Sequence, residues 1–535
     1  MEEAIKKYNL IFIVLIMAVA IFLRFYDLKT APPGLYSDEA MNGANTLEVI
    51  EAPGGLWKNI KAFFPDNNGR EGLFIDIQAI AVKYLGNEAW VLRLVSAIFG
   101  SLTVWGLYLL TKELFNKESV ALLASLFLAT SFWHINFSRI GFRAIMAPFF
   151  LCWGLWLVFV LRRKPNWLLG LFSGFVFSLG FNSYISYRMA PLLLIFPLWP
   201  LLKNKKILAL VFFVIGVCLA VYPLANYYFA HPQDFLGRTS QISIFSAASP
   251  ILELAKNIII TIGMFLVVGD FNWRHNIAGN PELWWPMAIL FLIGIIISVK
   301  KIRKKEEPVA SYWLLVTWLV IMLLPVVISD EGLPHALRSI VVAPVAMIFA
   351  ALGSVWLIEK ISAWLKTQKE KYPEKIRQLS RIKFELNVLL FAFLIVFCIN
   401  TYKQYFWDWA ARPEVASSFN KDMADLGNYL NRAPIGIKKY VIANSDGDSQ
   451  ILPMQTLPIM FLSDTYLKQK QDEKDIYYIL PKDIDNFIKE ANSERSIQIF
   501  MMKNDPQLRK KLSEAIPGLF TYTDQNVLIQ QRYRE

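Results

Sequence analysis

The sequence predicts a polytopic α-helical membrane protein of about eleven spans, followed by a small C-terminal α/β domain. The first observation is composition, because 55% of the 535 residues are hydrophobic and 14% are aromatic. The second is clustering, since apolar runs such as residues 10–25, 207–225 and 388–399 approach or reach bilayer-spanning length. The third is the change after about residue 402, where short strand-like segments replace the long runs. A water-soluble core requires no such series of long apolar runs.

The apolar runs define the predicted spans, near residues 9–26, 89–111, 119–136, 144–161, 167–184, 188–202, 207–226, 283–299, 309–328, 339–359 and 385–401. The first run follows two lysines, and residues 18–20 offer the small-x-small pattern of a signal-peptide cleavage site. The run continues to Phe25, however, and many spans follow. We therefore expect an uncleaved first helix.

The basic residues indicate the topology. The net charge is +12, but Lys and Arg gather in short clusters between spans, at residues 162–164, 203–206, 300–305 and 360–383. Clusters of this kind are typical of cytoplasmic loops, where they set the topology. The positive net charge therefore does not require a nucleic-acid partner. The three cysteines lie far apart within apolar runs, which gives neither a disulfide framework nor a thiolate metal site.

With the N-terminus inside, every basic cluster falls on the cytoplasmic side. Residues 27–88, residues 227–282 and the C-terminal tail then fall outside. The sequence thus predicts a multi-pass protein of the cell (inner or plasma) membrane. It has a transmembrane domain over residues 1–401 and an extracytoplasmic α/β domain over residues 402–535.

The outer segments carry their own elements. We expect a helix over residues 37–52 with Ser37 as its N-cap, and a second, interfacial helix over residues 54–64. Residues 251–270 are apolar and predict a re-entrant or membrane-surface helix, because a twelfth span would invert the later topology.

The tail alternates between strand-like and helix-like segments. Four segments resemble strands, at residues 438–444, 475–480, 496–502 and 526–533. Residues 481–491 and 505–515 between them predict helices that begin at Pro or Asp. The Ser-Asp-Gly-Asp-Ser stretch at 445–449 lacks the spacing of a phosphate-binding loop.

An acidic pair, Asp38 and Glu39, follows the first span on the outer side. Carboxylates in a first helical turn are favoured by the helix dipole, so the pair also fits a simple solvated helix start. Other charged stretches share this side, at residues 67–79, 137–148, 182–191, 269–281 and 330–339. Their arginines run against the positive-inside bias, and charged groups at membrane depth are usually functional.

Acids and arginines together at an outer membrane surface suit a particular chemistry. Arginine binds phosphate oxygens in a bidentate fashion, and a carboxylate can act as a general base. The combination fits a lipid-linked phosphate donor and a hydroxyl-bearing acceptor.

The ensemble resembles the GT-C superfamily of membrane glycosyltransferases, specifically the protein O-mannosyltransferase and aminoarabinose-transferase-like group (glycosyltransferase families 39 and 83). The matching residues cover roughly residues 10–340 and are Ser-Asp-Glu-Ala at 37–40, Arg-Glu-Gly-Leu at 70–73, and the stretches 138–143, 184–188, 269–276 and 334–338. The resemblance implies a polyprenyl-phosphate-linked sugar donor. It also implies inverting transfer of the sugar to an acceptor hydroxyl on the extracytoplasmic face.

The resemblance also implies roles for individual residues. Asp38 resembles the catalytic base, and Glu39 is either a supporting acid or only a helix-start residue. The candidates for binding the donor phosphate are arginines, namely Arg139, Arg143, Arg188, Arg338 and Arg70. For each of these the alternative is an interface residue whose charged end reaches toward water.

Glu71 and His275 match positions that resemble metal ligands in the aminoarabinose-transferase branch, so a divalent metal is a possible cofactor. This chain departs from the pattern, because Arg70-Glu71-Gly72 stands where that branch has a lysine and prolines after the acid. No other cofactor is expected. The acceptor is a protein, a lipid or a glycan, and membrane lipids surround the protein.

The alternative function is a transporter or flippase of lipid-linked glycans, whose path the same charged residues would line. Such a protein should show ionisable residues near mid-membrane and two related halves. The sequence has few of the former and no convincing halves. A receptor whose tail is the functional part would leave the outer charges unexplained.

Overall fold

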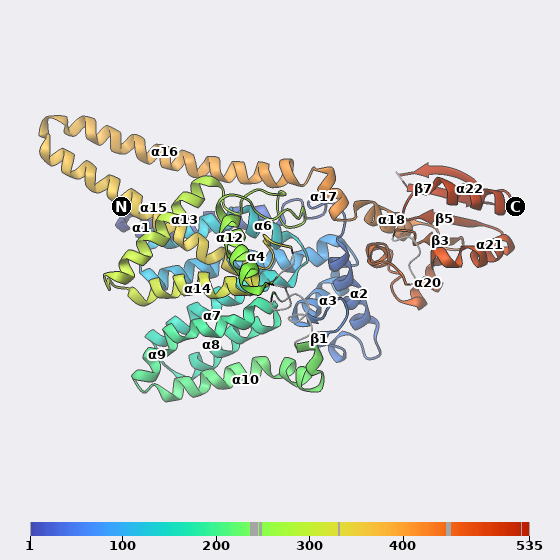
Figure 1. Ribbon diagram of the computed structural model, residues 1–535, viewed down its shortest axis with the longest axis horizontal. Coiled ribbons are helices and arrows are strands. Elements are labelled where there is room, and N and C mark those ends of the chain that lie inside the picture. Colours follow the sequence, from blue (N-terminus) through green and yellow to red (C-terminus); the bar gives the residue numbers. More distant parts are fainter. Residues whose placement is uncertain are drawn as a thin grey trace. The chain divides into compact units, whose positions relative to one another are not determined.

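The computed structural model describes residues 2–235, 244, 249–329, 332–445, 451–525 and 527–533, without the side chains of residues 3–5 (Figure 1). Most of the Ser-Asp-Gly-Asp-Ser stretch therefore lies outside the described residues. The chain divides into two compact units. Unit 1 comprises residues 1–28, 62–74 and 93–410, and unit 2 comprises residues 29–61, 75–92 and 411–535.

Unit 1 is helical, as predicted. In the described ranges, nine helical stretches are long and apolar enough to cross a membrane. Its α-helices are α1 (Glu2–Phe25), the greater part of α4 (Ala89–Phe115), α5 (Glu118–Ala129), α6 (Phe132–Arg139), α7 (Met146–Arg163), α8 (Trp167–Leu179), α9 (Ile195–Lys203), α10 (Ile207–Ala230), α12 (Pro250–Leu266), α13 (Trp285–Arg303), α14 (Val309–Val327), α15 (Ala343–Lys371) and α16 (Ile376–Lys403). The polytopic α-helical fold class is confirmed.

Two predicted spans take other forms. The span expected at residues 119–136 is a bent pair, in which α5 and α6 meet at 56°. Thr130 and Ser131 interrupt the helix, and the Ser131 hydroxyl caps α6 by accepting a bond from the backbone N–H of His134 at 3.4 Å. The span expected at residues 167–184 is a shorter apolar helix over 167–182. Together with the nine long stretches, these two account for the eleven predicted runs.

The helix predicted at residues 251–270 is present as α12, which ends four residues earlier. Asn257 anchors it inside unit 1, because its amide donates to the backbone carbonyls of Val327 and Ser329 at 3.0 and 2.9 Å. Glycines allow other helices of this unit to pack closely. A Cβ on Gly174 of α8 would lie 2.0 Å from the backbone oxygen of Phe213 in α10.

Unit 2 is built around a five-stranded sheet in the order β4-β3-β5-β7-β6. The four predicted strands are confirmed as β3 (Lys438–Ile442), β4 (Ile476–Ile479), β5 (Ile497–Met501) and β7 (Val527–Arg532), while β6 (Phe520–Asp524) was not predicted. The pairs β3·β4 and β3·β5 are parallel, and β7 is antiparallel to both β5 and β6. The α/β character of the tail is therefore confirmed.

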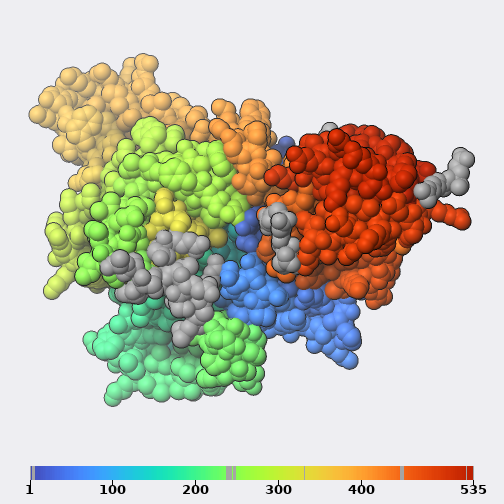
Figure 2. All heavy atoms as spheres, turned by 45° about the vertical axis from the view of Figure 1, so that its right-hand side comes forward, coloured from blue at the N-terminus to red at the C-terminus, as the bar shows by residue number. Residues whose placement is uncertain are grey.

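The strands of unit 2 place alternate side chains on opposite faces of the sheet. Tyr440 and Ile442 pack against α21 (Ile484–Ser493) and α22 (Pro506–Ala515), the two predicted helices. Val441 and Ala443 pack on the other face, against α18 (Lys421–Arg432) and α19 (Leu457–Leu462). In the space-filling view the C-terminal residues form a closely packed body (Figure 2). Two further short helices complete the tail, α17 (Pro413–Ser418) and α20 (Lys468–Lys474).

The loop over residues 27–88, which was predicted to lie outside, contributes to unit 2 as well. Its predicted helix is present as α2 (Ser37–Glu51), which packs through Ala40, Ala44 and Leu47 on residues of α19. The fit is close at Gly43, where a Cβ would lie 2.5 Å from the ring of Phe461. Unit 2 also contains residues 75–85 of α3 (Leu73–Leu85). The prediction had assigned the whole of residues 27–88 to the transmembrane domain, whereas these apolar contacts group much of that loop with the sheet.

The interfacial helix predicted at residues 54–64 was wrong. The structure has only a single 3-10 turn, Leu56–Lys58, followed by the short strand β1 (Phe63–Phe64). Gly54 and Gly55 both adopt positive φ angles, which break a helix at its start. Trp57 is 64% exposed, whereas Phe63 and Phe64 are buried.

Candidate active site

A short hairpin in unit 1 positions the first candidate residues. The strand β1 pairs antiparallel with β2 (Arg70–Glu71), which places Phe63 opposite Glu71. The turn between them is left-handed at Asn67, Asn68 and Gly69. The ring of Phe63 packs on Tyr227 and Tyr228 at the end of α10, with centroids 4.9 and 5.4 Å apart. The hairpin therefore holds the Glu71 carboxylate beside the end of a membrane-spanning helix.

Two of the predicted arginines meet this hairpin. Arg143, which precedes α7, donates from Nε to Oε2 of Glu71 at 2.7 Å, and the two side chains are only 15% and 6% exposed. Arg188 donates from Nη2 to the Tyr228 hydroxyl at 3.3 Å and from Nη1 to the backbone oxygen of Phe235 at 2.9 Å. Tyr228 interacts electrostatically with Glu71, Arg143 and Arg188. We call these four residues the arginine cluster.

The arginine cluster has the chemistry of an anion site. It brings two guanidinium groups and one carboxylate together, so its formal charge is positive. The ion pair of Arg143 uses Nε, and its Nη groups make no hydrogen bond within the described chain. Planar guanidinium groups in a partly desolvated setting suit a phosphate group, because they can donate two parallel bonds to its oxygens.

The other predicted arginines lie in different surroundings. Arg139 is fully buried, donates to the backbone oxygens of Leu23 and Asp27 at 3.0 and 3.1 Å, and lies 4.8 Å over the ring of Phe406. This contact stabilises the C-terminal end of α1, where unpaired carbonyls favour a cation. The expectation that Arg139 binds the donor phosphate is at odds with these contacts.

Arg338 and Arg70 are also buried, at 6% and 3% exposed. Arg338 donates to the Ser329 hydroxyl, which joins the two ends of a loop. Arg70 lies on β2 opposite Phe64, one residue before Glu71. Neither side chain shares the contacts that define the arginine cluster.

The acidic pair lies at the start of α2 in unit 2. The N-cap is Tyr36 rather than the predicted Ser37, since Tyr36 is the last residue with extended angles (φ −69°, ψ 147°). Glu39 is fully buried and completes a capping box, in which its Oε2 accepts from the Tyr36 backbone N–H at 3.3 Å. This contact is one that a helix-start residue makes. Asp38 beside it is half-buried in the first turn.

His275 lies in a compact group of potential metal ligands within unit 1. Its Nδ1 is 2.8 Å from Oδ2 of Asp270, and its ring stacks on His335 at 5.1 Å. One donor atom each from Asp270, His275 and His335 lie within 4.8 Å of one another. The same Asp270 carboxylate accepts from the backbone N–H of Ala336 at 2.9 Å, which ties two loops together. Glu71, the other predicted ligand, instead bonds to Arg143.

Sequence reasoning missed Tyr228 and Asp270. Tyr228 ends an apolar run, where a tyrosine is ordinarily an interface residue, so its pairing with Arg188 had no sequence signal. Asp270 does have a signal, because it stands five residues before His275 in a stretch already selected for its charges. His335, from another of these charged stretches, contacts both Asp270 and His275.

Comparisons with known proteins show which family and which fold this chain is similar to. The family model described as dolichyl-phosphate-mannose-protein mannosyltransferase matches residues 74–225. The Bacillus subtilis (strain 168) protein YkcB, a mannosyltransferase by name, is 27% identical over 208 residues. That match covers 37% of this chain and only 27% of the length of YkcB.

Two solved structures share the fold over nearly the whole chain. ArnT from Cupriavidus metallidurans, bound to undecaprenyl phosphate, has a TM-score of 0.59 at 11% identity, covering 97% of both chains. The oligosaccharyltransferase AglB from Archaeoglobus fulgidus, with an inhibitory peptide and a dolichol-phosphate, has a TM-score of 0.50 at 14% identity, covering 98% of this chain and 74% of that one. The resemblance to GT-C membrane glycosyltransferases is thereby confirmed, and the chain has the fold of these enzymes.

Proposed function

We propose that this protein is an inverting glycosyltransferase that takes its sugar from a polyprenyl-phosphate-linked donor. The acceptor is a hydroxyl group on the extracytoplasmic face of the membrane. The observation that carries the proposal is the arginine cluster, a positively charged group of buried and half-buried side chains at the end of a membrane-spanning helix. The phosphate-lipid partners named for ArnT and AglB, which share the fold, support the same class of donor.

In the proposed reaction the acceptor oxygen attacks the anomeric carbon from the face opposite the phosphate. The new glycosidic C–O bond forms as the bond between that carbon and the phosphate oxygen breaks. The acceptor proton passes to a carboxylate, for which the resemblance implies Asp38, and the bonding electron pair leaves with the polyprenyl phosphate. The leaving phosphate gains negative charge, which Arg143 and Arg188 stabilise because their guanidinium groups are already in place.

Glu71 and Tyr228 act in this proposal as positioning residues. Glu71 fixes Nε of Arg143, which directs the remaining N–H groups of that side chain away from the ion pair. Tyr228 fixes one Nη group of Arg188 in the same way. Side chains held by such bonds lose little freedom when the donor binds.

The residues present also fit the divalent metal that the resemblance implies, but with a changed set of ligands. Two imidazoles and one carboxylate, from Asp270, His275 and His335, are typical zinc ligands. We propose these three and not Glu71, whose carboxylate is bonded to a guanidinium. A metal there would supply positive charge and cross-link two loops of unit 1.

The test offers purified, reconstituted protein a panel of radiolabelled polyprenyl-phosphate sugars together with membrane-extracted acceptors. Transfer should release polyprenyl phosphate and label one acceptor fraction. Arg188→Ala should reduce this transfer, whereas Arg162→Ala in the predicted cytoplasmic cluster should not. Movement of intact labelled lipid between leaflets without release of polyprenyl phosphate would instead identify the protein as a flippase.

A further inference from the structure

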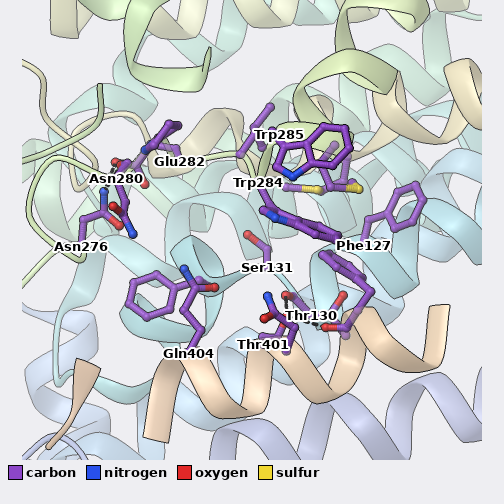
Figure 3. Close-up of a pocket in the computed structure, with 17 residues that line it drawn as sticks. Phe127, Thr130, Ser131, Asn276, Asn280, Glu282, Trp284, Trp285, Thr401 and Gln404 are labelled. Carbon is purple, nitrogen blue, oxygen red and sulfur yellow. Dashed lines mark hydrogen bonds between the residues drawn. The ribbon is translucent and has the colours of Figure 1, made fainter. Parts of the chain in front are cut away.

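A second site lies in unit 1 on residues that the proposed transfer reaction does not use. A cavity of about 350 Å³ lies where the break between α5 and α6 meets the loop before α13 and the end of α16 (Figure 3). This volume falls within the range of small-molecule sites. All of its lining residues belong to unit 1, so the site is complete within one compact unit.

One side of the cavity is polar and uncharged apart from a single carboxylate. Asn276, Asn280 and Glu282 lie together on this side, and Gln404 lies on the helix across from them (Figure 3). The Glu282 side chain is 7% exposed, and its Oε1 accepts from the Asn276 amide at 3.2 Å. Its Oε2 is buried and has no hydrogen-bond partner among the described residues. A buried oxygen left without a partner is unfavourable unless a ligand supplies one.

The other side of the cavity is aromatic. Trp284 stacks nearly parallel to Phe397 at 5.5 Å, and Phe127 meets Phe397 edge-on at 6.2 Å. This wall offers a flat apolar surface beside the amide and carboxylate groups. None of the 17 described lining residues is Lys, Arg or His, so the cavity offers nothing to neutralise a phosphate. Its chemistry is therefore opposite to that of the arginine cluster.

An apolar groove lies further along two of the helical segments that line the cavity. In α5, four residues from Ser119 to Leu126 line a groove of about 480 Å³, whereas Phe127 and, just after the helix, Thr130 and Ser131 line the polar cavity. In the same way, six residues of α16 from Leu390 to Ile399 line the groove, whereas Phe397, Asn400, Thr401 and, just after the helix, Gln404 line the cavity. In both α5 and α16, the groove residues therefore come mainly before the cavity residues along the chain. Apart from Ser119 and Cys398, the groove is lined by aliphatic and aromatic side chains.

We propose that the cavity and the groove together bind a neutral glycolipid. The sugar headgroup lies in the cavity, where its hydroxyls pair with the carboxyl group of Glu282 and with the amides of Asn276 and Gln404. One apolar face of the sugar ring packs on the aromatic wall, and an acyl chain follows α16 along the groove. Carboxylate and amide groups suit hydroxyl-rich ligands, and the lack of cations selects against phosphate headgroups. The inference stands independently of the proposed transfer reaction.

The test uses the full chain in phosphatidylcholine nanodiscs with a photoreactive probe. The probe is monoglucosyl diacylglycerol with a diazirine in one acyl chain, and cross-linked peptides are mapped by mass spectrometry. We expect labelling of α5 and α16 that excess unlabelled glucosyl diacylglycerol abolishes. Diacylglycerol and phosphatidylglycerol of the same chain length should compete at least about tenfold less well. Diacylglycerol lacks the sugar hydroxyls, and phosphatidylglycerol carries a phosphate for which the cavity has no cation.

Four variants separate headgroup binding from chain binding. Glu282→Leu and Gln404→Leu should each weaken labelling about tenfold, since each removes a buried hydrogen-bonding partner. Leu394→Trp should block the groove. Val388→Trp serves as its matched control, because Val388 lies on the same helix, is 49% exposed and lines neither site. Thermal unfolding of each variant checks that it has folded.

Two results would overturn the proposal. Equal competition by diacylglycerol would mean that the site binds only an acyl chain. Stronger competition by phosphatidylglycerol would mean that it prefers an anionic headgroup. Because Leu394→Trp acts on the groove alone, it provides a test even if the Glu282 variant fails to fold.

Discussion

Replacing both halves of the Glu71–Arg143 ion pair separates the structural contribution of Arg143 from its proposed role in catalysis. The two side chains are 6% and 15% exposed and 2.7 Å apart. Removing one partner leaves a buried charge without compensation, so Glu71→Gln and Arg143→Gln alone should each destabilise the protein by about 3 kcal/mol. The double variant removes both charges of the pair, so it should be about 2 kcal/mol more stable than either single variant.

Activity should not recover with stability. If Arg143 stabilises the charge on the leaving phosphate, its loss should lower kcat by about 10²- to 10³-fold. The double variant should therefore be nearly as stable as the wild type and still be inactive. The measurements are thermal unfolding in detergent and release of polyprenyl phosphate from the radiolabelled donor.

A second ion pair provides the matched control. Arg163 donates to Glu113 at 2.8 Å, but its side chain is 55% exposed. Replacing that pair with two glutamines should cost less than about 1 kcal/mol and leave transfer unchanged. A Glu71→Gln/Arg143→Gln protein with wild-type kcat would refute the assignment of Arg143 to the donor phosphate.

Further predictions concern the acids and the histidines. Asp38→Asn should lower kcat by about 10²- to 10⁴-fold with unchanged membrane insertion. Glu39→Gln should keep both the activity and the capping box. Equal activity of the two variants would refute the assignment of Asp38 as the base. Burial raises the pKa of Asp76 from 3.8 to about 7. Its ionisation is thus disfavoured in the folded state, so stability should fall as pH rises from about 4 to about 7. Asp76→Asn should flatten that dependence and be more stable at pH 8 by about 2 kcal/mol, measured by unfolding across pH. His335→Ala should lower the zinc content of the purified protein and remove any rise in Tm on adding Zn²⁺, whereas Glu71→Gln should leave the zinc content unchanged.

The fold was largely predictable because membranes and sheets impose strong periodic patterns. The length of an apolar run indicates the length of a spanning helix, and the alternation of apolar and polar residues indicates a half-buried strand. The bend between α5 and α6 was not predictable, because Thr130 and Ser131 are common inside membrane helices. The false helix at residues 54–64 arose from weighting its aromatic residues above the two glycines that precede them. The strand β6 was missed because most of its residues are exposed or half-buried, which leaves little hydrophobic pattern.

The candidate site was predictable by residue type but not by partner. The arginines predicted to lie outside could be selected because they run against the positive-inside bias, and the acids because they share those stretches. Arg143 pairs with Glu71, which lies 72 residues earlier in the chain, whereas Arg139 caps α1. Nothing in the sequence distinguishes these two arginines. Likewise His275 could be selected, while its contact with His335 across 60 positions could not.

The sequence by itself determined the class of protein, the number of apolar runs, the α/β tail and the residue types suited to a phosphate-linked donor. These features follow from composition and from the spacing of neighbouring residues, which do not depend on how distant segments pack. Tertiary structure alone decided that Arg143 and Arg188 share a cluster, that Arg139 does not, and that a polar cavity and an apolar groove lie along the same two helical segments. Those facts depend on which distant segments pack together, and that pairing is set by the shape and burial of the whole unit and not by any local pattern.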